Sequence, residues 1–152
     1  MIQTIRGDVT FPIGEGHKVI AHCCNDLGVM GAGVAWAIRK KWHHVFGAYY
    51  KWLQAGEAGL GSCQIVSAEP GISVANIIGQ RGVGFDDDGN PPIRYEALEK
   101  GLRFASDFVR QKGASLHLPR MGAGLAGGDW DIIYGIIERC CSDIDTTIYE
   151  FD

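Results

Sequence analysis

Apolar and polar residues follow different periods in successive parts of the chain, and the change of period predicts where strands and helices lie. Short apolar or alternating runs, most of them bounded by Gly, Pro, Asn or Asp, predict strands at Ile2–Arg6, Lys18–Cys24, Ser62–Ala68, Ser73–Ile78, Ser115–Leu118 and Thr146–Phe151. Helical spacing of apolar residues predicts helices at Gly33–Trp42, Val45–Ala55, Tyr95–Lys112 and Trp130–Cys141. A strand-rich beginning followed by strand and helix alternation indicates a mixed, mostly parallel six-stranded sheet covered by helices on both faces. We therefore expect a three-layer α/β/α sandwich that forms one domain over residues 1–152.

Composition is typical of a globular protein, with 46% apolar and 21% charged residues. No apolar run approaches the roughly 20 residues that span a bilayer, and the first residues alternate like a strand rather than a signal peptide. The five cysteines are odd in number and contain no CxxC spacing, which favours reduced thiols over a disulfide framework. We expect a cytoplasmic protein without a membrane partner.

Two charged clusters are interpreted as solvated surface. Three consecutive aspartates, Asp86 to Asp88, lie in an aperiodic stretch over residues 81–94, and their spacing matches no EF-hand, so we expect no metal site. Arg39, Lys40 and Lys41 end a predicted helix, where positive charge complements the helix dipole. With a net charge of −4, the chain as a whole does not attract a polyanion such as a nucleic acid.

Glycine-rich loops follow two of the predicted strands and precede helices. The first lies in "AHCCNDLGVMGAGVAWAI" over residues 21–38, and the second is "MGAGLAGGDW" over residues 121–130. Ligands of open α/β sheets bind outside the carboxyl ends of strands, where glycine lets backbone N–H groups approach a phosphate. Neither loop has the GxxxxGK[ST] pattern of an NTPase, and the first lacks the third glycine of a dinucleotide-binding motif.

Three co-linear motifs carry a resemblance to a known family. They are Gly7-Asp8-Val9-Thr10, the Ala21-His22-Cys23 strand leading to Met30-Gly31-Ala32-Gly33-Val34-Ala35, and Leu118-Pro119-Arg120-Met121-Gly122-Ala123-Gly124-Leu125. Together they resemble the macrodomain family, in the branch of terminal ADP-ribose protein glycohydrolases and ADP-ribose 1″-phosphate phosphatases. The resemblance implies an α/β/α sandwich with a cleft for ADP-ribose, no cofactor, and no nucleic-acid partner other than an ADP-ribosylated substrate.

The resemblance also assigns binding roles. In the family, the aspartate that Asp8 matches, beside Val9, accepts a hydrogen bond from the adenine amino group. Asn25 ends the second predicted strand near the expected distal ribose, so we expect it to hydrogen-bond the ribose hydroxyls. One loop lies against the distal ribose and the phosphates, and a second wraps the diphosphate; they comprise Met30, Gly31, Ala32, Gly33 and Val34, and Gly122, Ala123, Gly124, Leu125 and Ala126. Phe151 either stacks on adenine or packs in the core, whereas Tyr149 is a core residue.

Catalysis is where the sequence departs from the family pattern. Glycohydrolases of this branch use a lysine after the fourth strand and an aspartate after the second glycine loop, and these positions fall on Gly79 and Ala126 in a gapless alignment. Neither residue has a functional group for covalent or acid–base chemistry. The remaining candidates are His22, Asn25 and Gln80, while Asp129 is interpreted as a helix N-cap.

Two function hypotheses from different classes follow. The first is an enzyme that removes phosphate or a related group from the 1″ position of an ADP-ribose derivative without a metal. The second is a non-catalytic module that reads or sequesters ADP-ribose.

Overall fold

The computed structural model describes residues 1–151 and shows one six-stranded sheet with the order β1-β6-β5-β2-β4-β3. The strands are β1 (Ile2–Arg6), β2 (Lys18–Asn25), β3 (Cys63–Glu69), β4 (Ile72–Gln80), β5 (Ser115–Pro119) and β6 (Thr146–Glu150). Every neighbouring pair is parallel except β3 and β4, which are antiparallel and joined by a tight turn. The predicted mixed, mostly parallel sheet is therefore confirmed.

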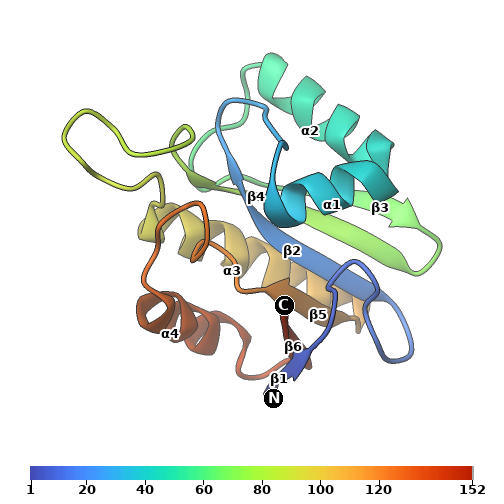
Figure 1. The fold of residues 1–152 in the computed structure, drawn as a ribbon. Coiled ribbons are helices and arrows are strands. Elements are labelled where there is room, and N and C mark those ends of the chain that lie inside the picture. Colours follow the sequence, from blue (N-terminus) through green and yellow to red (C-terminus); the bar gives the residue numbers. More distant parts are fainter. Residues whose placement is uncertain (152) are drawn as a thin grey trace.

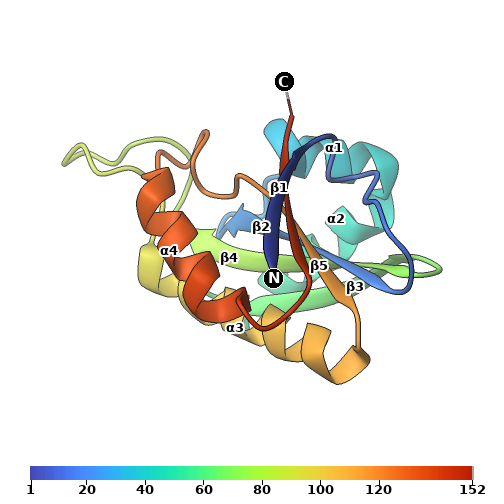
Figure 2. The same ribbon diagram turned by 90° about the horizontal axis from the view of Figure 1, so that it is seen from below.

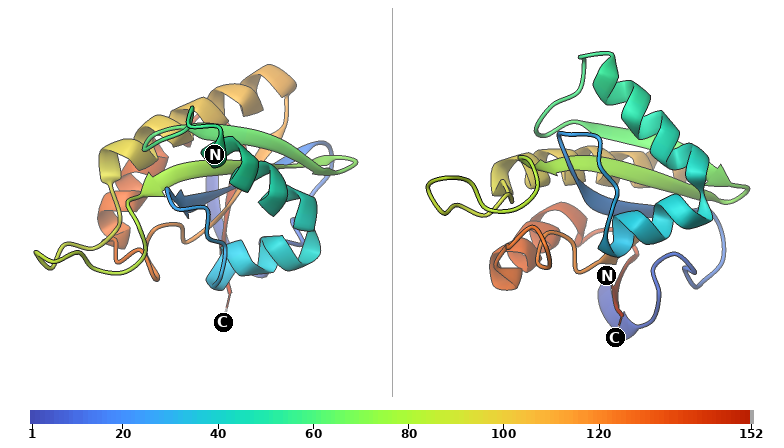
Figure 3. Two further views of the ribbon diagram at one scale, coloured as in Figure 1. Left: turned by 90° about the horizontal axis from the view of Figure 1, so that it is seen from above. Right: turned by 45° about the horizontal axis from the view of Figure 1, so that its top comes forward.

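Helices cover both faces of this sheet (Figure 1, Figure 2). The helices are α1 (Gly33–Lys41), α2 (His43–Gln54), α3 (Tyr95–Lys112) and α4 (Trp130–Cys141). One face is covered by α1 and α2 and the other by α3 and α4, as the two views of Figure 3 also show. Among residues 1–151, no helix is long and apolar enough to cross a membrane.

The apolar core is divided by the sheet. The larger part lies between the sheet and the α3 and α4 helices, where Leu98, Leu102 and Val109 of α3 are fully buried. Their spacing places them on one stripe of the helix, which explains why this segment folds as a helix against the sheet. The part under α1 and α2 includes Ile38 and Val45 and packs on alternate residues of the central strands.

Element bounds differ from the predicted ones by at most two residues, and two of the differences concern the site. The last strand ends at Glu150 rather than Phe151, because its partner β1 ends at Arg6 and the Gly7 amide closes the ladder on the Glu150 carbonyl. The fourth strand continues to Gln80, because a register shift after Cys24 lets Asn25 pair with Gln80.

The topology places the carboxyl ends of β1, β6, β5, β2 and β4 at one edge of the sheet. From β2 the chain first builds β3 and β4 on one side and then crosses back to β5 on the other side. The order of strands thus reverses at β2 and β5, which is where open α/β sheets hold their ligands.

Candidate functional site

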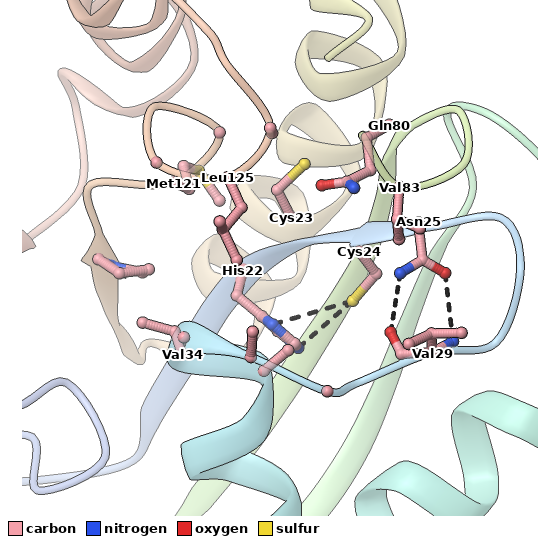
Figure 4. A pocket seen from close by; sticks show the side chains of 18 of the residues that line it. His22, Cys23, Cys24, Asn25, Val29, Val34, Gln80, Val83, Met121 and Leu125 are labelled. Atoms are coloured by element: carbon pink, nitrogen blue, oxygen red, sulfur yellow. Dashed lines mark hydrogen bonds between the residues drawn. The ribbon is translucent and has the colours of Figure 1, made fainter. Parts of the chain in front are cut away.

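A cleft of about 610 Å³ lies at the carboxyl edge of the sheet, lined by the loops that follow β2, β4 and β5. Its volume is in the range of pockets that hold small organic ligands. Figure 4 shows Met121 and Leu125 on one side of the cleft and Val34 and Val29 on the other, with Gln80 and Val83 at one end. The cleft therefore lies between the two glycine loops, at the switch in strand order.

Most of the predicted site residues come together around this cleft. Those that line it are His22, Asn25, Gly31, Ala32, Gly33, Val34, Gln80, Gly122, Gly124, Leu125 and Ala126. Five others lie outside the set of lining residues; they are Asp8, Val9, Met30, Ala123 and Phe151. Because Met30 is fully buried beside Cys24 and Tyr49, its side chain belongs to the core and only its backbone is available to a ligand.

The N-terminus of α1 opens into the cleft without a side-chain cap. Its N-cap residue is Ala32, which makes no capping hydrogen bond, and there is no acidic residue in the first turn. Gly33 has φ +61°, and a Cβ at that position would meet no atom within 4 Å. Uncapped N–H groups at a helix N-terminus attract anions. This end of α1 is therefore suited to a phosphate.

The start of α4 differs from that of α1. The Asp129 carboxylate accepts a hydrogen bond from the Asp131 amide at 2.9 Å, so this N-terminus already has its own anion. The interpretation of Asp129 as an N-cap is confirmed. Of these two helix starts that follow glycine loops, only α1 is left for a ligand.

Asn25 holds the first loop in shape. Its side-chain amide donates to the Val29 carbonyl at 2.8 Å, and its side-chain oxygen accepts from the Val29 amide (Figure 4). The same oxygen also accepts from the Leu27 amide at 3.0 Å. The same oxygen accepts from the Tyr49 hydroxyl at 2.9 Å. Because the side chain already has these partners, its contribution to the cleft is to position the backbone that leads to Gly31 and Gly33.

The glycines of the second loop serve packing as well as ligand access. A Cβ on Gly128 would lie 2.5 Å from the Gly122 carbonyl oxygen, and Gly122 itself has φ +76°. The Gly128 amide donates to that carbonyl at 2.8 Å, which closes the loop on itself. Gly124, by contrast, has open space around it and lines the cleft with Leu125.

The titratable side chains of the cleft are uncharged at neutral pH apart from one. Burial lowers the pKa of His22 to about 4, despite a hydrogen bond to Asn76 that raises it. Burial raises the pKa of Cys23 to about 12 and that of Cys24 well above its usual range, so neither thiol is ionised to act as a nucleophile. The exception is Arg120, whose guanidinium stacks on Trp130 at 4.7 Å.

Arg120 also lies 3.4 Å from the Glu150 carboxylate, so its charge has a partner within the protein. An anion in the cleft would then be held chiefly by backbone N–H groups rather than by side-chain cations. Among the described residues 1–151, no group of three or more His, Cys, Asp and Glu side chains is arranged to hold a metal ion.

Gly79 faces the interior rather than the cleft. A Cβ on Gly79 would lie 2.8 Å from Cys23 Sγ and 3.3 Å from Leu98 Cδ1. Its neighbour Gln80 lines the cleft and donates to the Gly82 carbonyl at 2.9 Å. Of Gly79 and Gln80, it is therefore Gln80 whose side chain lines the cleft at the end of β4. Ala126 lines the cleft from the opposite loop.

The residues predicted to hold adenine lie at the ends of β1 and β6. Asp8 Oδ1 accepts from the Thr10 amide at 2.9 Å and from the Thr10 hydroxyl at 2.7 Å, which fixes the turn after β1. Phe151 is 76% exposed, whereas Tyr149 is buried and hydrogen-bonded to His117. The core assignment of Tyr149 is confirmed; the roles of Asp8 and Phe151 stay predictions.

Some residues that line the cleft were not predicted. They are Cys23, Cys24, Val29, Ala35, Val83, Gly84, Pro119, Arg120 and Met121. Val83 and Gly84 were missed because the stretch 81–94 was interpreted as an aperiodic loop whose notable residues were the solvated Asp86 to Asp88. Its position directly after a central parallel strand was the available signal, since that places its first residues at the ligand edge.

Comparison with known proteins agrees with this geometry. The model of the Macro domain family matches residues 21–137. The chain is similar to a protein of unknown function from Bacteroides thetaiotaomicron, at 43% identity and a TM-score of 0.95, covering 99% of this chain and 98% of that one. A macrodomain protein from Streptomyces coelicolor is 40% identical with a TM-score of 0.86, covering 98% of each chain. An ADP-ribose 1″-phosphate phosphatase from Candida albicans is 27% identical over 100% of this chain and 94% of its own length.

Proposed function

Because the chain belongs to the Macro domain family, we propose that its cleft binds ADP-ribose and hydrolyses ADP-ribose 1″-phosphate to ADP-ribose and inorganic phosphate. The observation that carries the proposal is the uncapped N-terminus of α1, which faces a second glycine loop across the cleft. Two backbone segments rich in N–H groups suit a diphosphate better than a single phosphate. The phosphatase named among the relatives supports the choice of reaction.

The reaction needs a water molecule directed at the 1″ phosphorus. The oxygen of that water forms a bond to phosphorus, the bond between phosphorus and the 1″ oxygen breaks, and one proton moves from the water to the departing oxygen. Gln80 and His22 line the cleft and can orient or deprotonate the water. We expect Asn25 to act indirectly, because its side chain is occupied in holding the loop.

The alternative is a module that binds ADP-ribose without turnover. The observation that favours it is the absence of a carboxylate and of a lysine from the described residues that line the cleft. A histidine buried to 2% exposure is also a weaker proton acceptor than one with an ordinary pKa. We further propose a cytoplasmic location, which the five free cysteines support.

The test is a calorimetric titration with ADP-ribose together with a phosphate-release assay on ADP-ribose 1″-phosphate. AMP and ribose 5-phosphate serve as control ligands, because each offers only one phosphate to the two loops. We expect ADP-ribose to bind at least tenfold more tightly than either control, and phosphate to be released with turnover. Binding without release supports the binding module, and no binding of ADP-ribose overturns both readings.

A further inference from the structure

A chain of two side-chain amides, the buried Asn76 and the half-buried Gln64, leads from the cleft to the backbone of α2. His22 Nε2 lies 2.7 Å from Asn76 Oδ1, and Asn76 Nδ2 donates to Gln64 Oε1 at 3.0 Å. Gln64 Nε2 in turn donates to the Ala48 carbonyl at 3.0 Å. His22 and Asn76 are also paired in register on the neighbouring strands β2 and β4. The chain thus connects three strands and one helix.

The position of this chain in the core is unusual for polar residues. Asn76 is completely buried, and its neighbours on the same face of β4, Val74 and Ile78, are completely buried aliphatic residues. Polar side chains at such a position need every partner satisfied, whereas an aliphatic residue would need none. Burying this polar network therefore costs free energy that aliphatic residues at the same positions would not cost, so packing alone does not explain it.

The direction of the hydrogen bonds is set at the α2 end. A backbone carbonyl only accepts, so Gln64 must present its NH₂ group to Ala48 and its oxygen to Asn76. Asn76 must then turn its NH₂ group toward Gln64 and its oxygen toward His22. Since that oxygen only accepts, His22 must carry a proton on Nε2. One fixed acceptor determines the orientation of every group up to the cleft.

The ring of His22 is therefore held as one neutral tautomer. Burial keeps its pKa near 4, so at neutral pH its single ring proton is on Nε2 and Nδ1 has a lone pair that can accept a proton. Cys24 Sγ lies 3.5 Å from Nε2 and 3.8 Å from Nδ1, and it stays a thiol, which is a weak hydrogen-bond donor, because burial raises its pKa. Tyr49, on α2, also stays protonated because burial raises its pKa.

We propose that Asn76 and Gln64 are positioning residues that hold His22 with Nδ1 as the proton acceptor of the cleft. The inference rests on the proposed function. In the reaction, Nδ1 takes a proton from the attacking water as its oxygen bonds to phosphorus. The 1″ oxygen leaves from the opposite side of phosphorus and takes a proton from solvent, and Nδ1 then releases its proton to solvent, so His22 ends the cycle neutral.

The test compares two substitutions of Gln64 that differ in the atom facing Asn76. Gln64→Glu keeps an acceptor for the Asn76 amide and so preserves the direction of the chain, whereas Gln64→Met has a similar shape and no acceptor. Asn76→Leu removes the partner of His22 altogether. Ser106→Ala, which removes a buried hydroxyl bonded to Cys141 on the other face of the sheet, is the control for general loss of stability.

Three quantities are measured for each variant that keeps a cooperative thermal transition. They are the dissociation constant for ADP-ribose, the rate of phosphate release, and the ¹⁵N chemical shifts of the His22 ring, assigned with His22→Gln. We expect all variants to bind within about twofold of the wild type, because none of the changed atoms touches the phosphate loops. We expect phosphate release to fall by about tenfold or more in Asn76→Leu and Gln64→Met, and to be retained in Gln64→Glu and Ser106→Ala.

The ¹⁵N shifts separate positioning from mere stability. The wild type and Gln64→Glu should show protonated Nε2 and unprotonated Nδ1, while Asn76→Leu and Gln64→Met should show a mixture of tautomers. A wild-type ring protonated on Nδ1, or wild-type turnover in Asn76→Leu, overturns the inference alone. No phosphate release by the wild-type protein overturns the proposed function and, with it, the catalytic use of His22.

Discussion

A negative charge at the N-terminus of α1 gives the sharpest test of where the ligand phosphates lie. Gly33 lines the cleft, and the space around its Cβ position is open, so Gly33→Glu places a carboxylate where we expect the diphosphate. At a separation of about 4 Å and an effective dielectric near 20, two like charges repel by about 4 kcal/mol. This corresponds to a loss of affinity of about three orders of magnitude.

The chain offers matched controls for this substitution. Gly89 also has a positive φ, +81° against +61° for Gly33, and also has no atom within 4 Å of its Cβ position. Both substitutions should therefore cost about 1–2 kcal/mol of folding free energy from the left-handed backbone. Gly89→Glu should leave ADP-ribose affinity unchanged, and Gly33→Gln should bind far more tightly than Gly33→Glu.

The assay is calorimetric titration with ADP-ribose at two salt concentrations, with thermal unfolding of every variant as the check on folding. Repulsion predicts that the Gly33→Glu defect is reduced when salt is raised, because exposed charges are screened. An equal loss in Gly33→Gln would refute the electrostatic argument and indicate a steric effect. Normal affinity in a folded Gly33→Glu protein would refute the placement of the phosphates.

Three further outcomes are expected. Asp8→Ala should weaken ADP-ribose binding at least tenfold, from the loss of a charge-assisted hydrogen bond of about 1.5–3 kcal/mol, and calorimetry would contradict this by finding unchanged affinity in a folded variant. Gly79→Ala should lower the free energy of unfolding by about 1–3 kcal/mol in urea titrations, because its Cβ would lie 2.8 Å from Cys23 Sγ. An unaltered urea midpoint would show that neighbouring side chains move to accommodate the methyl group. His22 and His117 each have a pKa lowered by burial to about 4, so the unfolded chain takes up protons first as pH falls below about 6.5. The two histidines should leave stability unchanged above neutral pH and lower it by about 2 kcal/mol each at pH 5, and a flat stability profile between pH 7 and 5 would rule this out.

Periodicity was sufficient to predict the elements of the fold because each one has a single buried stripe or face. The spacing of Leu98, Leu102 and Val109 in α3, for example, predicts both the helix and the side that packs on the sheet. The order of strands was not predictable in this way. The pairing of β2 with both β4 and β5 depends on long-range contacts that leave no local signal in the sequence.

The candidate site was predictable as far as it is made of backbone. Glycine loops after parallel strands predicted the cleft, because the need for close approach restricts the residue type. Side-chain orientation was not predictable at the end of β4, where a gapless alignment assigned the reactive position to Gly79. The structure turns Gly79 toward Leu98 and presents Gln80 to the cleft, since successive residues of a strand face opposite sides.

The uncapped start of α1 has a consequence for how the site responds to mutation. An alanine scan removes side chains, but the groups expected to hold the ligand here are main-chain N–H groups that every residue except proline provides. Such a scan would show almost no effect on binding in the two phosphate loops, and many substitutions there would be tolerated as long as the backbone of the loops keeps its path. Side chains around the mouth are therefore free to diversify toward different adducts of one common ligand, while insertions, deletions and proline in residues 28–35 would abolish recognition altogether.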